Sequence, residues 1–164
     1  MVEFPLTELR TLQASIGAAN AAKGFHQEGD ALRYRVANPL IGKSPIVQEW
    51  AVSDATALRN YYANKLLLVV SEVVEAHDEL RKGNDVDYEY YSSPGNDHMT
   101  PSEADEYLEV NGFPAKPEGF LSESVDAIIR LFDVLDEAKL DGPGMMQKKL
   151  IYNSFREKLH GKAF

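Results

Sequence analysis

The sequence has no cysteine, a single tryptophan, and many fewer basic than acidic residues: 17 Lys and Arg against 26 Asp and Glu, for a formal net charge of −9. The lack of cysteine excludes disulfides, thiolate metal sites and cysteine nucleophiles. The negative charge argues against a nucleic-acid polymer as partner, because contacts to its phosphates need clustered Lys and Arg. A small anionic ligand stays compatible with this charge, since a bound divalent metal inverts the local field.

Long hydrophobic runs are also missing. The longest strongly apolar run, Leu66 to Val70, is far shorter than the ~20 residues that a membrane-spanning helix needs. The first ten residues have neither the basic start nor the apolar stretch of a secretion signal. We therefore expect a soluble, cytoplasmic protein without a membrane partner. Its 164 residues fit one domain, residues 1–164.

Helical periodicity dominates what is present. We find no internal repeat and no convincing strand, so we predict an all-α fold, a helical bundle. Residues His26 to Trp50 look irregular, because Pro39, Gly42 and Pro45 interrupt any long period. The predicted helices run from Thr7 to about Lys23, from Ser53 or Asp54 through the central stretch to about Gly83, from Leu121 to Leu140, and from Met145 to about Leu159.

Residues 85–119 differ in character from the helices on either side. They are acidic, rich in tyrosine and turn residues, and without a period in their first half. Thr100 and Glu103 then form a capping box, which predicts a short helix to about Val110, ended by Gly112. We interpret the segment as an insertion between two acidic helices, serving as a lid or as an oligomer contact.

Two acidic pairs carry the functional argument. Glu72 and Glu75 are three residues apart, and Glu123 and Asp126 repeat that spacing. Residues three apart share one helix face, so each pair can converge on one point. Glu79, one turn further along, is either a third ligand or a solvated acid, and we favour solvation. The opposite faces are predicted to be core stripes, formed by Leu66, Val69, Val70, Val73, His77 and Leu80 in the first helix, and by Leu121, Val125, Ile128, Phe132 and Leu135 in the second.

Four carboxylates on two helices favour Mg²⁺, with Mn²⁺ as the related possibility. Mg²⁺ takes hard oxygen ligands and keeps several waters, which leaves room for phosphate oxygens. Neither acidic pair has a histidine three or four residues on, as a di-iron site would. Lys149, Asn153 and Arg156 share one face of the last predicted helix, and a lysine, an amide and a guanidinium there suit phosphate oxygens.

The ordered set of motifs resembles the MazG-like all-α nucleoside triphosphate pyrophosphatases. KLLLVVSEVVEAHDELRKG with Glu72 and Glu75 is similar to that family's first metal helix, and SESVDAIIRLFDVL with Glu123 and Asp126 to its second. The stretch from Asn20 to Phe25 is similar to the end of its first helix, and Lys149, Asn153 and Arg156 with the terminal HGKAF to its phosphate-contacting end.

The resemblance implies hydrolysis of (deoxy)nucleoside triphosphates to monophosphate and pyrophosphate. It implies that the four acids bind Mg²⁺, that one of them orients the attacking water, and that Lys149, Asn153, Arg156 and Asn20 contact the substrate. It also implies a homodimer or homotetramer. The gap between the two acidic pairs is longer than is usual in the family, and residues 85–119 fill it.

Two other functions stay open at this point. One is a related helical enzyme acting on another nucleotide, such as phosphoribosyl-ATP. The other is a non-catalytic helical interaction module whose acids only decorate the surface. The sequence gives no code for the base or sugar of a nucleotide, which we expect residues 26–50 and the insertion to select.

Overall fold

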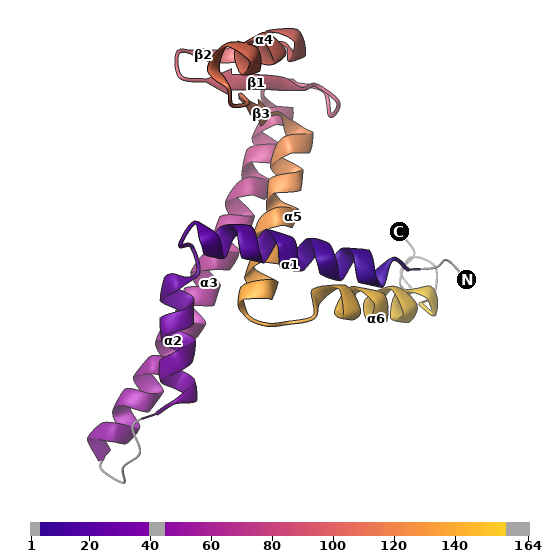
Figure 1. Cartoon of the computed structure of the whole chain (residues 1–164). Coiled ribbons are helices and arrows are strands. Elements are labelled where there is room, and N and C mark those ends of the chain that lie inside the picture. Colours follow the sequence, from indigo (N-terminus) through magenta and orange to yellow (C-terminus); the bar gives the residue numbers. More distant parts are fainter. Residues whose placement is uncertain (1–3, 40–44, 157–164) are drawn as a thin grey trace. The chain divides into compact units, whose positions relative to one another are not determined.

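The computed structural model describes residues 4–39 and 45–156, and it confirms the all-α prediction, with one small sheet added (Figure 1). Among the helices of these residues, none combines the length and the apolar character needed to cross a membrane. The elements are α1 (Leu6–Ala22), α2 (Gln27–Ala37), α3 (Pro45–Arg81), β1 (Tyr90–Ser93), β2 (Asn96–Met99), α4 (Pro101–Asn111), β3 (Lys116–Glu118), α5 (Phe120–Glu137) and α6 (Gly142–Ser154).

The chain divides into two compact units. The first unit comprises Met1–Tyr62 and Phe132–Phe164, and the second unit comprises Ala63–Leu131. The boundaries fall inside α3 and α5, so each of these helices contributes to both units. Both predicted acidic pairs belong to the second unit.

In the first unit, α1 packs against α6 and α2 against the first half of α3. Gln13 on α1 donates a hydrogen bond to the carbonyl of Leu140 (2.7 Å) and accepts one from the amide of Gly142 (3.2 Å), which fixes the start of α6. On α2, Arg35 pairs with Asp54 of α3 at 3.0 Å. Polar contacts therefore join the helices within each of these two pairs.

Two predictions about this unit are wrong. The described residues between 26 and 50 are mostly helical rather than irregular, because α2 occupies Gln27–Ala37 and α3 begins at Pro45. This helix is mostly exposed and buries only Gly29 and Leu32, so it leaves almost no apolar period in the sequence. Ser53 and Asp54 also do not cap a helix, since α3 begins at Pro45 and passes through them. The predicted end of the last helix at Leu159, like the terminal HGKAF, lies outside the described residues.

The second unit joins the acidic halves of α3 and α5 to the insertion. The insertion forms an antiparallel sheet of order β2-β1-β3, in which Tyr91 faces Met99 on one side and Pro117 on the other. Buried Met99, Ala104 and Ala115 form a small core with α4, against which Tyr91 and Tyr107 pack. The capping box of Thr100 and Glu103 and the left-handed Gly112 (φ 74°) confirm the predicted short helix, whereas the strands were not predicted.

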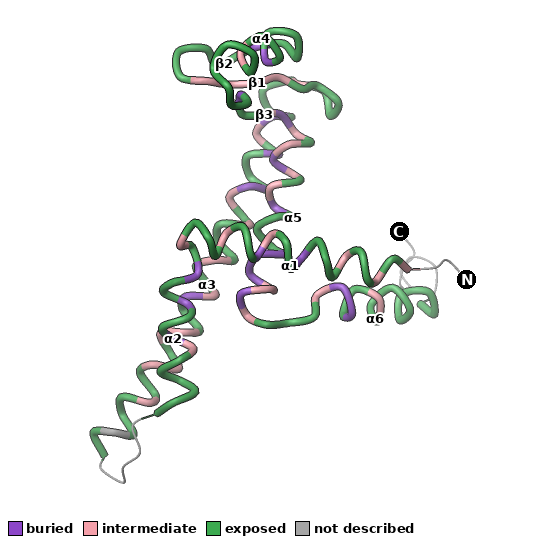
Figure 2. Tube along the Cα trace, in the orientation of Figure 1, coloured by how far each residue is buried: buried purple, intermediate pink, exposed green. Residues whose placement is uncertain are grey.

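The predicted core stripes of α3 and α5 are wrong for the single chain. Phe132 is buried, but the other large apolar side chains of both stripes are mostly exposed (Figure 2). Buried residues on α3 follow the acidic face instead, at Glu72, Ala76 and Glu79. Periodicity gives the spacing of a helical face, but it does not say which face the rest of the chain covers. Exposed members of the two stripes are Leu66, Val70, Val73, His77 and Leu80 on α3, and Leu121, Val125 and Ile128 on α5.

Candidate metal centre

Three of the four predicted metal ligands come together in the second unit. Glu72 and Glu75 on α3 and Glu123 on α5 each offer a carboxylate oxygen, and these oxygens all lie within 4.8 Å of one another. Asp126, half-buried one turn after Glu123, is outside this group. Its charge still acts on the neighbouring Lys116. The two helices therefore present an acidic surface to each other, as the spacing predicts.

Small residues and an ion pair hold the two helices at this contact. By helical spacing, Ala76 on α3 and Ala127 on α5 share the acidic faces, and both are buried. Glu72 is 5% exposed, and its Oε1 accepts from Nε of Arg130 at 2.6 Å. Arg130 thus neutralises one buried acid and ties α5 to α3.

Glu123 is the acid whose charge is least compensated. It is 3% exposed, and its Oε1 lies 3.6 Å from Nζ of Lys116, which is beyond a good hydrogen bond. Its Oε2 is buried and has no hydrogen-bond partner among the described residues. Burial raises the pKa of Glu123 to about 7; Glu118 and Glu75 add to the rise, and Lys116 opposes it.

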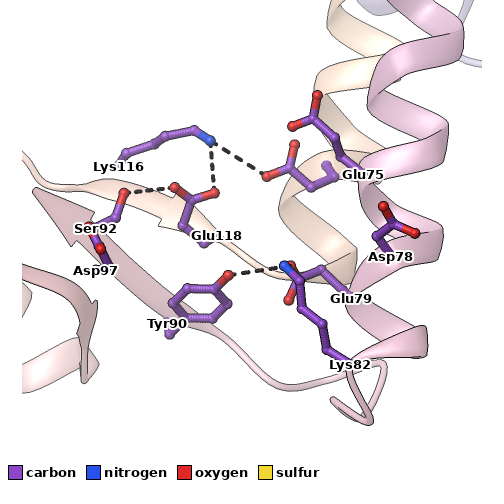
Figure 3. A pocket seen from close by; sticks show the side chains of 10 residues that line it. Glu75, Asp78, Glu79, Lys82, Tyr90, Ser92, Asp97, Lys116 and Glu118 are labelled. Carbon is purple, nitrogen blue, oxygen red and sulfur yellow. Dashed lines mark hydrogen bonds and ion pairs between the residues drawn. The ribbon is translucent and has the colours of Figure 1, made fainter.

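The insertion adds two residues that sequence reasoning missed. Lys116 and Glu118 alternate on β3, so they project from the same side of the strand. Glu118 accepts hydrogen bonds from Lys116 Nζ and Ser92 Oγ, each at 2.7 Å (Figure 3). Burial alone would raise the pKa of Glu118, but the hydrogen bonds from Lys116 and Ser92, together with a hydrogen bond from the carboxyl group of Glu123 and the charge of Lys116, outweigh it and hold the pKa below its usual value. The sequence does contain one signal for these two residues: in KPEG, immediately before the second acidic helix, the charged residues alternate with an uncharged one, as on one side of a strand.

Glu79 forms a separate polar cluster rather than a solvated surface, so that prediction is wrong. It is 4% exposed and accepts from Lys82 (2.6 Å), Asn84 (2.8 Å) and Tyr90 (3.3 Å). Burial opposes the ionised form, yet these donors lower the pKa of Glu79 overall. Its oxygens are therefore engaged in tying the end of α3 to the insertion (Figure 3).

A pocket of about 400 Å³ adjoins the acids and is walled partly by α3 and partly by the insertion. This volume falls within the range of small-molecule sites. In Figure 3, Lys116 and Tyr90 extend from the strands of the insertion toward the acids of α3, which include Glu75 and Glu79. Its lining residues are Glu75, Asp78, Glu79, Lys82, Tyr90, Ser92, Asp97, Lys116, Glu118 and Glu123.

The charges at the acids do not balance. Five carboxylates gather there and two cations face them, which leaves a formal charge of −3 when all are ionised. Together with the buried, unpaired Oε2 of Glu123, this excess fits a divalent cation with oxygen ligands, such as Mg²⁺ or Mn²⁺. The carboxylates are those of Glu72, Glu75, Glu118, Glu123 and Asp126, and the cations are Lys116 and Arg130.

The predicted substrate-contacting residues belong to the first unit. Asn20 lies on α1, Lys149 and Asn153 lie on α6, and Arg156 follows the end of α6. Lys149 and Arg156 both approach the ring of Tyr152, at 5.6 and 5.9 Å from its centroid. The two cations therefore share one exposed aromatic surface, and their contact with a phosphate stays a prediction.

A second buried polar cluster, in the first unit, was not predicted. Nε2 of His26 lies 2.7 Å from Asp133, and Tyr61 donates to Glu137 at 2.6 Å. Arg33 lies 3.8 Å from Glu137, so the positive charge beside this buried acid comes from an arginine and no metal ion is needed to supply it. Burial raises the pKa of Tyr61, and Glu137 adds to the rise. We interpret the cluster as structural, since it joins α2, α3 and α5 and closes over Gly29, where a Cβ would collide with Glu137.

Comparison with known proteins gives no match. No protein-family model matches the sequence, no curated protein is significantly similar to it, and no solved structure matches the chain.

Proposed function

We propose that the chain is a Mg²⁺-dependent nucleoside triphosphate pyrophosphohydrolase of the MazG-like all-α type. The observation that carries the proposal is the convergence of Glu72, Glu75 and Glu123 within 4.8 Å, with a buried carboxylate oxygen of Glu123 left without a partner. The products would be a nucleoside monophosphate and pyrophosphate. Mn²⁺ would replace Mg²⁺ at such a site, because both prefer oxygen ligands.

The chemistry follows from the charge at the site. Glu72, Glu75 and Glu123 would hold the ion, and Asp126, which lies outside this group, would become a fourth ligand by moving toward the bound ion. When bound, the ion neutralises phosphate charge and makes water more acidic. The carboxylates then orient the attacking water in line with the α-phosphate, and hydrolysis depends on positioning and charge stabilisation. Lys149, Asn153, Arg156 and Asn20 stay the substrate contacts that the resemblance implies.

The setting is a cytoplasmic homo-oligomer, a dimer or a tetramer. Apolar side chains along α3 and α5 support this, since they are exposed in the single chain. The net charge of −9 makes a free nucleotide a better substrate than a nucleic-acid polymer.

A product assay tests the proposal. The protein is incubated with Mg²⁺ and a panel of nucleoside and deoxynucleoside triphosphates, together with phosphoribosyl-ATP. We expect pyrophosphate and the matching monophosphate in equal amounts. Orthophosphate with a diphosphate would show attack at the terminal phosphate and contradict the reaction. Selective turnover of phosphoribosyl-ATP would mean that this compound, and not a nucleoside triphosphate, is the substrate. No turnover of any substrate would favour an interaction module.

Two site variants and one matched control separate this activity from a contaminant. Glu75→Gln and Glu123→Gln remove one ligand charge each, and we expect turnover to fall at least roughly 100-fold in both. Glu109→Gln removes an exposed acid from α4, away from the metal cluster, and should turn over normally. Equal activity in all three variants would contradict the site.

A further inference from the structure

Lys116 belongs to the insertion, and its side chain reaches from β3 toward the acids of the candidate metal centre. Its Nζ donates to Oε2 of Glu118 at 2.7 Å and lies 3.6 Å from Oε1 of Glu123. Strand β3 pairs with β1, with Lys116 opposite Ser92, so the sheet fixes the backbone from which this side chain extends. The insertion thereby places a positive charge beside an acid of the candidate metal centre.

The contact between Lys116 and Glu123 is incomplete. The 3.6 Å separation is longer than a hydrogen bond, and the second oxygen of Glu123 has no partner among the described residues. The side chain of Lys116 is 55% exposed, whereas that of Glu123 is 5% exposed. A buried carboxylate beside a half-exposed ammonium is only partly neutralised, and the long lysine stem can turn away without repacking a core.

We propose that Lys116 is a stand-in cation. In the metal-free protein it partly neutralises Glu123, and when the divalent ion binds it turns to a phosphate of the substrate. The proposal rests on the proposed function for the identity of the metal and of the phosphate ligand. It gives the insertion a role in the chemistry, as the source of a phosphate-binding residue.

The pocket offers Lys116 somewhere to turn. Lys116 and Glu123 both line it. Glu118, which accepts a hydrogen bond from Nζ of Lys116, can remain its partner while the lysine side chain turns. An ammonium group has three rotatable donors, so it can keep Glu118 while it donates to a phosphate oxygen. Lys82 in the same pocket is bound differently, because its 2.6 Å partner is Glu79, which is outside the metal cluster.

Lys116→Met tests the proposal through two affinities that should move in opposite directions. Binding of Mn²⁺ alone, followed by electron paramagnetic resonance, should tighten at least about threefold, because a competing positive charge is removed. Binding of inorganic pyrophosphate in the presence of Mg²⁺, followed by calorimetry, should weaken at least about tenfold, because a phosphate contact is lost. A lysine that only supported the fold would weaken both affinities or change neither.

Two further variants test whether the change in Mn²⁺ affinity comes from the positive charge at position 116. Lys116→Arg keeps the positive charge and should leave the Mn²⁺ affinity within about twofold of wild type. Lys148→Met removes an exposed lysine from α6, in the first unit, so the Mn²⁺ affinity should not change. If circular dichroism shows that Lys116→Met is unfolded, Lys116→Gln takes its place in both measurements.

The outcomes distinguish this proposal from the proposed function. Mn²⁺ affinity that stays unchanged or weakens on neutralising Lys116 overturns the stand-in role, even if wild type hydrolyses nucleotides. A pyrophosphate affinity that stays unchanged overturns the phosphate contact. Wild type that binds no Mn²⁺ overturns the proposed function together with this inference.

Discussion

Glu123 combines burial with a shortage of positive charge. Its side chain is almost fully removed from water, one oxygen has no partner, and the nearest ammonium is 3.6 Å away. Burial penalises the ionised carboxylate, and acids nearby increase that penalty, so the pKa rises to about 7. Near neutral pH the metal-free protein therefore holds a proton on Glu123 in part of the molecules, and Lys116 faces the ionised carboxylate in the rest. A divalent ion would displace that proton, which couples metal binding to pH.

The stability of the metal-free protein should fall between pH 5 and pH 8. The pKa of Glu123 is about 7 when folded against an ordinary value of 4.5, so the folded state holds the proton more tightly. This contribution is fully present below about pH 4.5 and is lost as pH rises through 7. We expect urea unfolding with a chelator to show wild type losing roughly 2 kcal/mol relative to Glu123→Gln over this range. Parallel stability curves would show that Glu123 does not titrate there.

At the scale of elements, periodicity predicted most of the helical segments but not which surfaces they bury. α4 was predictable because its ends carry local signals, the capping box at Thr100 and the left-handed Gly112. α2 was not, because few apolar residues mark its buried side. The acidic pairs were found from their spacing, which depends only on helix geometry. Lys116 and Glu118 were missed, because a three-residue strand leaves almost no pattern and its place depends on pairing with β1.

Removing the capping box should loosen the insertion. Thr100 accepts from the amide of Glu103, whose side chain in turn accepts from the amide of Thr100. We expect Thr100→Ala to cost about 1 kcal/mol and to speed hydrogen exchange of the α4 amides. Ser102→Ala changes an exposed position in the first turn of the same helix and should leave exchange unaltered. Equal exchange in the two variants would mean that the cap contributes nothing.

Gly119 joins β3 to α5, and substituting it should disturb the metal centre. Its φ is 109°, which L-residues rarely adopt, and an added Cβ would meet the carbonyl oxygen of Tyr88. We expect Gly119→Ala to cost roughly 2 kcal/mol and to weaken Mn²⁺ binding, because Glu118 and Glu123 lie on either side of it.

The hairpin glycine Gly95 is the matched control for this change. It also has a positive φ, 91°, but an added Cβ would meet nothing within 4 Å. Gly95→Ala should cost about 1 kcal/mol from backbone strain alone and leave the Mn²⁺ affinity unchanged. If both variants weaken Mn²⁺ binding equally, the junction at Gly119 has no special role in placing the acids.

For the whole molecule, the exposed apolar stripes call for a partner surface. On α3, Leu66, Val70 and Val73 follow spacings of four and three, and Val70 and Val73 are 54% and 55% exposed. Leu121, Val125 and Ile128 repeat these spacings on α5. Such spacing is that of helices packing side by side along a seam. The stripes lie on different helix faces from the acids, so a second copy can cover them and leave the metal centre accessible.

A charge placed in the stripe should therefore break the oligomer. We expect wild type to run as a dimer or tetramer by light scattering, and Val73→Glu to shift it to monomer, because a carboxylate cannot be buried unpaired in an apolar seam. Val110→Glu places the same charge on α4, where the side chain is 83% exposed, and should leave the mass unchanged. A monomeric wild type would contradict the oligomer, and it would leave these apolar side chains exposed to water without a physical reason. If Val73→Glu is monomeric and still binds Mn²⁺, the acids of one chain suffice for the metal, whereas loss of binding on dissociation would show that the second copy completes the site.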